Sequence, residues 1–63
     1  MGVAKVVEMV GSSPNNWEEA LRNVIEEAKK LGDVRGVDVL SIKAVIREGV
    51  IKEWRTVVKV AYV

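Results

Sequence analysis

Residues 53–63, EWRTVVKVAYV, are the part of the sequence that most restricts the fold. Read as a β-strand, this segment points successive side chains to opposite faces of a sheet. One face then carries Trp54, Thr56, Val58, Val60 and Tyr62, and the other carries Arg55, Val57, Lys59, Ala61 and Val63. Both faces are largely apolar, so a sheet that contains this strand needs cover on both sides.

The rest of the chain predicts one helix and two further strands. Residues 3–10 (VAKVVEMV) are rich in valine and end at Gly11, which is typical of a short strand. An amphipathic helix of about 15 residues is predicted to begin between residues 13 and 17, because apolar residues recur at spacings of three and four. Residues 37–46 and 51–63 predict two strands joined by a turn with Glu48 and Gly49 at its tip. The helical stripe consists of Trp17, Ala20, Leu21, Val24, Ile25, Ala28 and Leu31.

The predicted helix has two possible starts. Ser13 followed by Pro14 is one capping pattern, and Asn16 with Glu19 three residues later is another. Gly32 is a plausible residue just beyond the end of the helix. On its solvent face we expect pairs four residues apart, such as Glu26 with Lys30.

These elements predict an α+β fold with β-α-β-β order. A three-stranded antiparallel sheet in the order 1-3-2, wrapped on one helix, fits the connections, and residues 1–63 should form a single domain. One helix covers only one face, so the other must be buried against another copy or another protein. Strict alternation in the second strand places Leu40, Ile42, Ala44 and Ile46 on one face, and Val37, Val39 and Val45 with Ser41 and Lys43 on the other.

Composition narrows the class of protein. A domain of 63 residues without cysteine or histidine has neither disulfides nor a Cys/His zinc site, which favours oligomerisation as its support. Ten basic and nine acidic residues, interleaved along the chain, argue against nucleic-acid binding. With no signal peptide or membrane-spanning run, a cytoplasmic protein is expected. Without histidine, cysteine or paired carboxylates, catalysis has no support and a protein that is not an enzyme is predicted.

Two segments carry a resemblance to a known family. These are VVEMVGSSPNNWEEALRNVIEEA, with its VE-x-VG-[ST]-S turn leading into S-P-x-x-W-E-E-A, and EGVIKEWRTVVKVAYV at the end of the chain. Together they resemble the dodecins, small proteins whose subunits assemble into a hollow shell of twelve. The match spans essentially the whole chain. It implies a homo-dodecamer that binds small ligands between its subunits.

The resemblance also bears on the ligand. Many dodecins bind flavins in pairs at two-fold axes, where a tryptophan before the second strand stacks on the ring and a glutamine on the third strand hydrogen-bonds its edge. Gly36 and Arg55 stand at those two positions in this sequence. The resemblance therefore implies that the stacking site is lost, as in a dodecin subgroup associated with calcium. By position, Arg55, Gly36 and Ser41 are the candidate ligand-binding residues, and the metal ligands stay unknown.

Several interpretations stay open at this point. The shell could hold calcium, or a phosphate-bearing cofactor bound by Arg55. It could instead store FMN or riboflavin, with Arg55 in place of the glutamine, or the chain could be a structural module for a different protein. Arg55 could equally form an ion pair between subunits, for example with Asp38. Gly36 could be a turn residue with positive φ, and Trp17 is expected to pack in the core.

Overall fold

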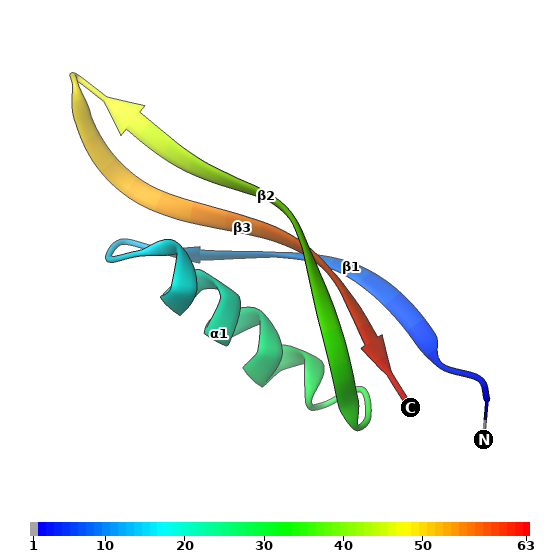
Figure 1. Cartoon of the computed structure of the whole chain (residues 1–63). Coiled ribbons are helices and arrows are strands. Elements are labelled where there is room, and N and C mark those ends of the chain that lie inside the picture. The colour runs from blue at the N-terminus through cyan, green and yellow to red at the C-terminus, as the bar shows by residue number, and fades with distance from the viewer. Residues whose placement is uncertain (1) are drawn as a thin grey trace.

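The computed structural model describes residues 2–63, which form one helix and a three-stranded sheet (Figure 1). The strands run antiparallel in the order β1-β3-β2, which confirms the predicted α+β fold and its β-α-β-β order. The β2–β3 hairpin continues past α1 as an arm, and the chain is elongated, with extents of 49 × 18 × 12 Å (Figure 1). Within the described part, no helix is long and apolar enough to cross a membrane. The elements are β1 (Lys5–Ser13), α1 (Trp17–Ala28), β2 (Val34–Arg47) and β3 (Val50–Tyr62).

The start of α1 is fixed by the second of the two predicted caps. Asn16 is extended, and its side-chain oxygen accepts a hydrogen bond of 2.7 Å from the backbone N–H of Glu19. Ser13 is instead the last residue of β1, and its hydroxyl donates to the Glu19 carboxylate at 2.9 Å. Hydrogen bonds from Asn15 and then Ser13 hold the pKa of Glu19 below its ordinary value.

The end of α1 comes earlier than predicted, at Ala28, and Lys29 is its C-cap. The backbone N–H groups of the next two residues bond to carbonyls three positions back, so the chain tightens into a turn before Gly32. The predicted Glu26–Lys30 pair is therefore wrong. Lys29 pairs with Glu26 at 2.6 Å, and Lys30 pairs with Glu27 at 2.8 Å, where the hydrogen bond raises the pKa of Lys30.

The core lies between α1 and the middle of β3. Val58 and Val60 are fully buried there, and the fully buried Thr56 donates a hydrogen bond of 2.9 Å to the Trp17 carbonyl. Gly11 of β1 lets the helix approach closely. A Cβ atom at that position would overlap the backbone carbonyl of Ala20 and lie 2.6 Å from Cγ2 of Val24. The helix contributes Ala20, Val24 and Ala28 to this core.

Strand β2 departs from strict alternation at Leu40. Val39 lies opposite Val58, yet Ser41 lies opposite Val57, so Leu40 is the extra residue of a β-bulge. Paired residues share a face of the sheet, so Val39, opposite Val58, lies on the side of α1. Val37, opposite Val60, lies on the same side and packs against the core. The prediction that Val37 and Val39 share a face with Ser41 is therefore wrong, because periodicity alone does not foresee a bulge.

Candidate functional site

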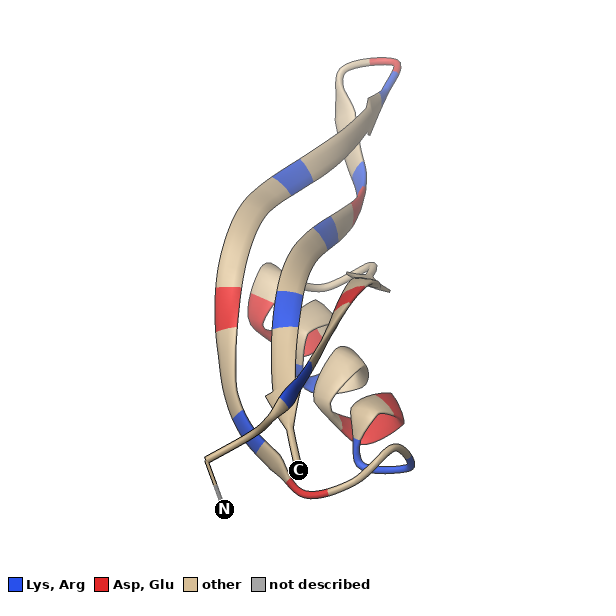
Figure 2. Cartoon of the chain, turned by 90° about the vertical axis from the view of Figure 1, so that its right-hand side faces the viewer, with Lys and Arg blue, Asp and Glu red and all other residues tan. Residues whose placement is uncertain are grey.

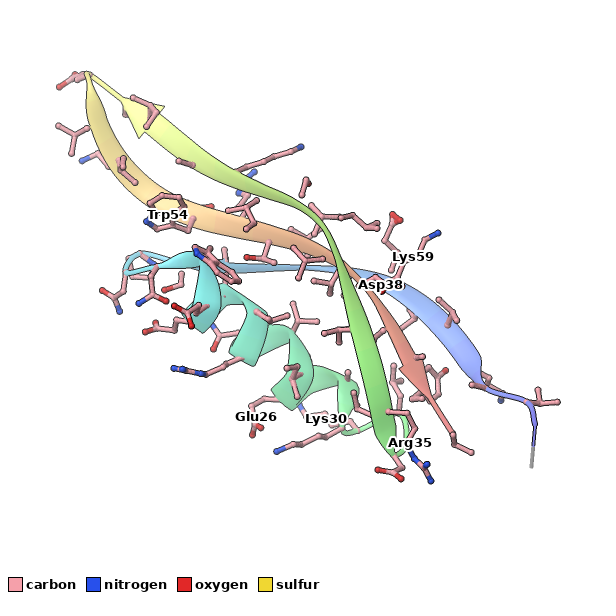
Figure 3. The ribbon with its side chains drawn as sticks, in the orientation of Figure 1. Glu26, Lys30, Arg35, Asp38, Trp54 and Lys59 are labelled. Atoms are coloured by element: carbon pink, nitrogen blue, oxygen red, sulfur yellow. The ribbon has the colours of Figure 1, made fainter. Side chains whose placement is uncertain are left out.

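The side of the sheet away from α1 has no cover within the described chain, and we call it the open face. Its strand pairing places residues in four rows that run from β1 across β3 to β2. Figure 3 shows Asp38 and Lys59, which belong to one of these rows, projecting away from α1. The rows are Val6–Ala61–Gly36, Glu8–Lys59–Asp38, Val10–Val57–Ser41 and Ser12–Arg55–Lys43.

Apolar side chains on the open face stay exposed in a single chain. Val6 is 63% exposed and Val10 is 61% exposed, whereas Val58 and Val60 on the helix side are 0% exposed. Large contiguous apolar patches on soluble proteins usually mark an interaction surface. The second apolar face that residues 53–63 predict is therefore present in the fold, and it is uncovered in the described chain.

Gly36 lies inside β2, opposite Ala61, and not in a turn. Within residues 2–63 only Gly2 and Gly49 are glycines with positive φ, so the interpretation of Gly36 as such a turn residue is wrong. A Cβ atom at Gly36 would meet nothing within 4 Å. The two small residues leave a shallow hollow of about 370 Å³, with Val6, Asp38 and Lys59 among its lining residues.

Arg55 is exposed on the open face and carries one ion pair within its own chain. Its Nε donates to the Glu53 carboxylate at 2.6 Å. Lys43 lies directly opposite on β2, so two cations face each other across neighbouring strands. Sequence reasoning did not single out Lys43, because a register shift between Val45 and Ile46 determines this pairing and the sequence gives no sign of it.

The three candidate residues lie on the same face but not at the same place. Ser41 is half-buried opposite Val57, between the rows of Gly36 and Arg55. Six positions of β3 separate Ala61, the partner of Gly36, from Arg55, which is about 20 Å at the usual strand rise. A small ligand that touches both Gly36 and Arg55 therefore needs two copies of the chain.

Neither tryptophan lies on the open face. Trp54 pairs with Ala44 and points to the side of α1 (Figure 3). Trp17 is the first residue of that helix. Both side chains are partly buried. Nowhere in residues 2–63 do three or more Asp, Glu, His or Cys side chains gather closely enough to hold a metal ion.

Comparison with known proteins identifies the family. The dodecin family profile matches residues 3–63. The chain belongs to the dodecin family. None of the curated proteins matches the sequence significantly.

Solved structures resemble this dodecin over nearly its whole length. A protein from Thermus thermophilus is 33% identical, with a TM-score of 0.88 over 95% of this chain and 90% of its own. The dodecin from Streptomyces davaonensis is 26% identical, with a TM-score of 0.88 and the same two coverages. The calcium dodecin from Mycobacterium tuberculosis, at 24% identity, shares the fold, with a TM-score of 0.84 over 97% of this chain and 89% of its own.

Proposed function

We propose that this chain is a subunit of a self-assembling, non-enzymatic shell that holds a small ligand or ion between its subunits. The observation that carries this proposal is the uncovered apolar surface of the open face, on which Val6 and Val10 are more than half exposed. Twelve subunits are the expected number, from the family resemblance. Such an assembly would also support a domain that is too small to bury a large core alone.

The side chains of the open face favour an anionic ligand. Arg55 and Lys43 lie directly opposite each other, and like charges in that position destabilise a sheet. A phosphate bound between them would offset the repulsion and accept hydrogen bonds from both cations. Ser12 is in the same row and Ser41 is in the next, so hydroxyl donors are close by.

The resemblance and the position of Gly36 together favour a ligand that is not a stacked flavin. Glycine offers no ring, and both tryptophans lie on the helix side of the sheet. These observations support the proposal that the chain is a dodecin without the stacking tryptophan. If the chain bound flavin, riboflavin fluorescence would be quenched when micromolar protein is added. Unchanged fluorescence would exclude it.

The anionic-ligand proposal is tested with two probes that share a ring system and differ in phosphate. We expect ADP to bind to the purified protein and adenosine to bind at least tenfold more weakly, about 1.4 kcal/mol. Arg55→Ala should abolish this preference. Arg35→Ala is the matched control, since Arg35 pairs with Asp33 at the far end of β2. Equal binding of both probes, or of neither, would contradict the proposal.

Calcium is the second candidate, because the calcium dodecin from Mycobacterium tuberculosis shares this fold. Calcium takes six to eight oxygen ligands, commonly from carboxylates. Since the described residues of one chain contain no such cluster, a calcium site would have to combine carboxylates of several subunits, for example Glu8 and Asp38. Thermal melts in calcium and in EDTA should then differ, and coincident melts would eliminate this candidate.

A further inference from the structure

Glu53 is a carboxylate beside the two cations that face each other on the open face. It lies two positions before Arg55 on β3, so both side chains project from the same face. Its partner on β2 is Val45, two positions from Lys43, which makes Glu53 a diagonal neighbour of that lysine. On β1 the partner of Arg55 is Ser12, which is uncharged. Figure 2 shows basic positions on both strands of the hairpin.

The ion pair between Glu53 and Arg55 uses one donor of the guanidinium group. The Nε atom of Arg55 donates to Oε2 of the half-buried Glu53 at 2.6 Å. A guanidinium group has further N–H donors at its two terminal nitrogens, and these are left for another acceptor. Within residues 2–63, Lys43 forms no ion pair. Glu53 thus holds Arg55 from the side and leaves its terminal donors, with the ammonium group of Lys43, to a ligand.

The charges of these three side chains do not balance. Arg55 and Lys43 carry one positive charge each and Glu53 carries one negative charge, so the group is singly positive. The repulsion between Glu53 and a bound anion grows in proportion to the charge of that anion. A doubly charged group also loses more hydration when it leaves water. The carboxylate therefore disfavours a second negative charge on the ligand.

We propose that Glu53 selects the charge of the ligand, so that Arg55 and Lys43 take a singly charged phosphodiester in preference to a doubly charged phosphate monoester. This inference rests on the proposed function, because it assumes that an anion binds between the two cations. Glu53 is a positioning residue and does not touch the ligand. It acts through Arg55, whose terminal donors it orients, and through its own negative charge.

AMP tests this selection, because its phosphate group gains a second negative charge near pH 6. In the wild type, the Kd for AMP measured by calorimetry should change by less than about threefold between about pH 5 and about pH 7.5. Glu53→Gln keeps an oxygen acceptor for Nε but removes the charge. In that variant AMP should bind about tenfold more tightly at the higher pH.

Two controls isolate the effect of the carboxylate. Cyclic AMP is a phosphodiester with a single charge over this pH range, so its Kd should not change with pH in either protein. The chain has no histidine, the side chain whose ordinary pKa lies in that range. Glu26→Gln removes a carboxylate from α1, on the other side of the sheet, and should keep the wild-type profile for AMP.

The outcomes separate this inference from the proposed function. A Glu53→Gln protein with the wild-type profile, or a wild type that binds AMP about tenfold more tightly at the higher pH, would overturn the charge selection while the anion site stands. If AMP and cyclic AMP bind to the wild type no more tightly than adenosine, the anion site is wrong and both proposals fail. If the variant does not fold, as judged by circular dichroism, the wild-type profile still decides.

Discussion

The two faces of the same sheet differ in where their cover comes from. On the helix side, Thr56, Val58 and Val60 are fully buried against α1, and Gly11 allows close contact between helix and strand. Val57 and Ala61 lie on the same strand, β3, but point to the open face. Val6, which pairs with Ala61 from β1, is mostly exposed there. The helix covers the middle of the first face, although Val39 and Ile42 on that side stay 42% and 44% exposed, whereas nothing in the described chain covers the second face.

This difference assigns separate roles to the two faces. The helix side determines whether the chain folds, because its buried contacts are all within one subunit. In the proposed assembly the open face determines whether the subunits associate, since its apolar rows would gain cover only from another molecule. Mutations on the two faces should therefore affect different measurements, and the following predictions test that separation.

Val57→Asp on the open face should have the largest effect. The carboxylate would have to be desolvated in the middle of the proposed interface, and even with Arg55 and Lys59 two positions away this should cost about 3 kcal/mol per subunit. We expect native mass spectrometry to show loss of the large assembly. The control is Lys52→Asp near the hairpin turn, which should still assemble. A Val57→Asp protein that assembles like the wild type would show that the open face is not the interface.

Gly11→Ala should be next in size, and it acts on the helix side. Its methyl group would overlap the backbone of Ala20, so the helix must shift away from β1, which costs about 1–3 kcal/mol. The urea midpoint of unfolding should fall accordingly. Gly36→Ala is the matched control, because that position has open space and should lose little stability. Equal losses at Gly11 and Gly36 would contradict the close helix contact.

Gly36→Trp should change ligand binding without changing the fold. The open hollow beside Ala61 accepts a larger side chain, and an indole ring there would offer a stacking surface worth about 1 kcal/mol beyond its area. Riboflavin affinity should therefore rise by roughly fivefold or more, measured by fluorescence quenching. Unchanged affinity in a correctly assembled variant would argue against a ligand site at Gly36.

Glu19→Gln, at the start of the helix, should have the smallest effect at neutral pH. Hydrogen bonds from Asn15 and Ser13 lower the pKa of Glu19, so the stability it contributes is present above the unfolded pKa and is lost as the pH falls through the lower, folded value. The wild-type melting temperature should thus fall more steeply below about pH 4.3 than that of the variant. Parallel curves would show that Glu19 does not contribute to acid sensitivity.

Much of this fold could be predicted from the sequence, because its patterns are local. The helix stripe, the Asn16 cap and the Glu48–Gly49 turn each follow from a few neighbouring residues, and all are present. The bulge at Leu40 was not foreseen, since it depends on how β2 meets β3. For the same reason the position of Gly36 inside β2 and the pairing of Lys43 with Arg55 were not apparent.

The candidate site was harder to predict than the fold. Sequence reasoning named Arg55 and Ser41 as candidates, and their pairing with Lys43 and Val57 places both on the open face. It gave no indication that Gly36 and Arg55 lie about 20 Å apart along the sheet. A site that needs two copies depends on the packing between subunits, and periodicity within one chain carries no information about that packing.

The most direct test of the separate roles of the two faces is a native mass spectrum of the purified wild-type protein at micromolar concentration. The account predicts one dominant species of twelve subunits, each of 7.0 kDa, with any retained ligand visible as added mass. A stable, folded monomer of 7.0 kDa as the dominant species would contradict it, because the apolar open face would then be satisfied without a second copy.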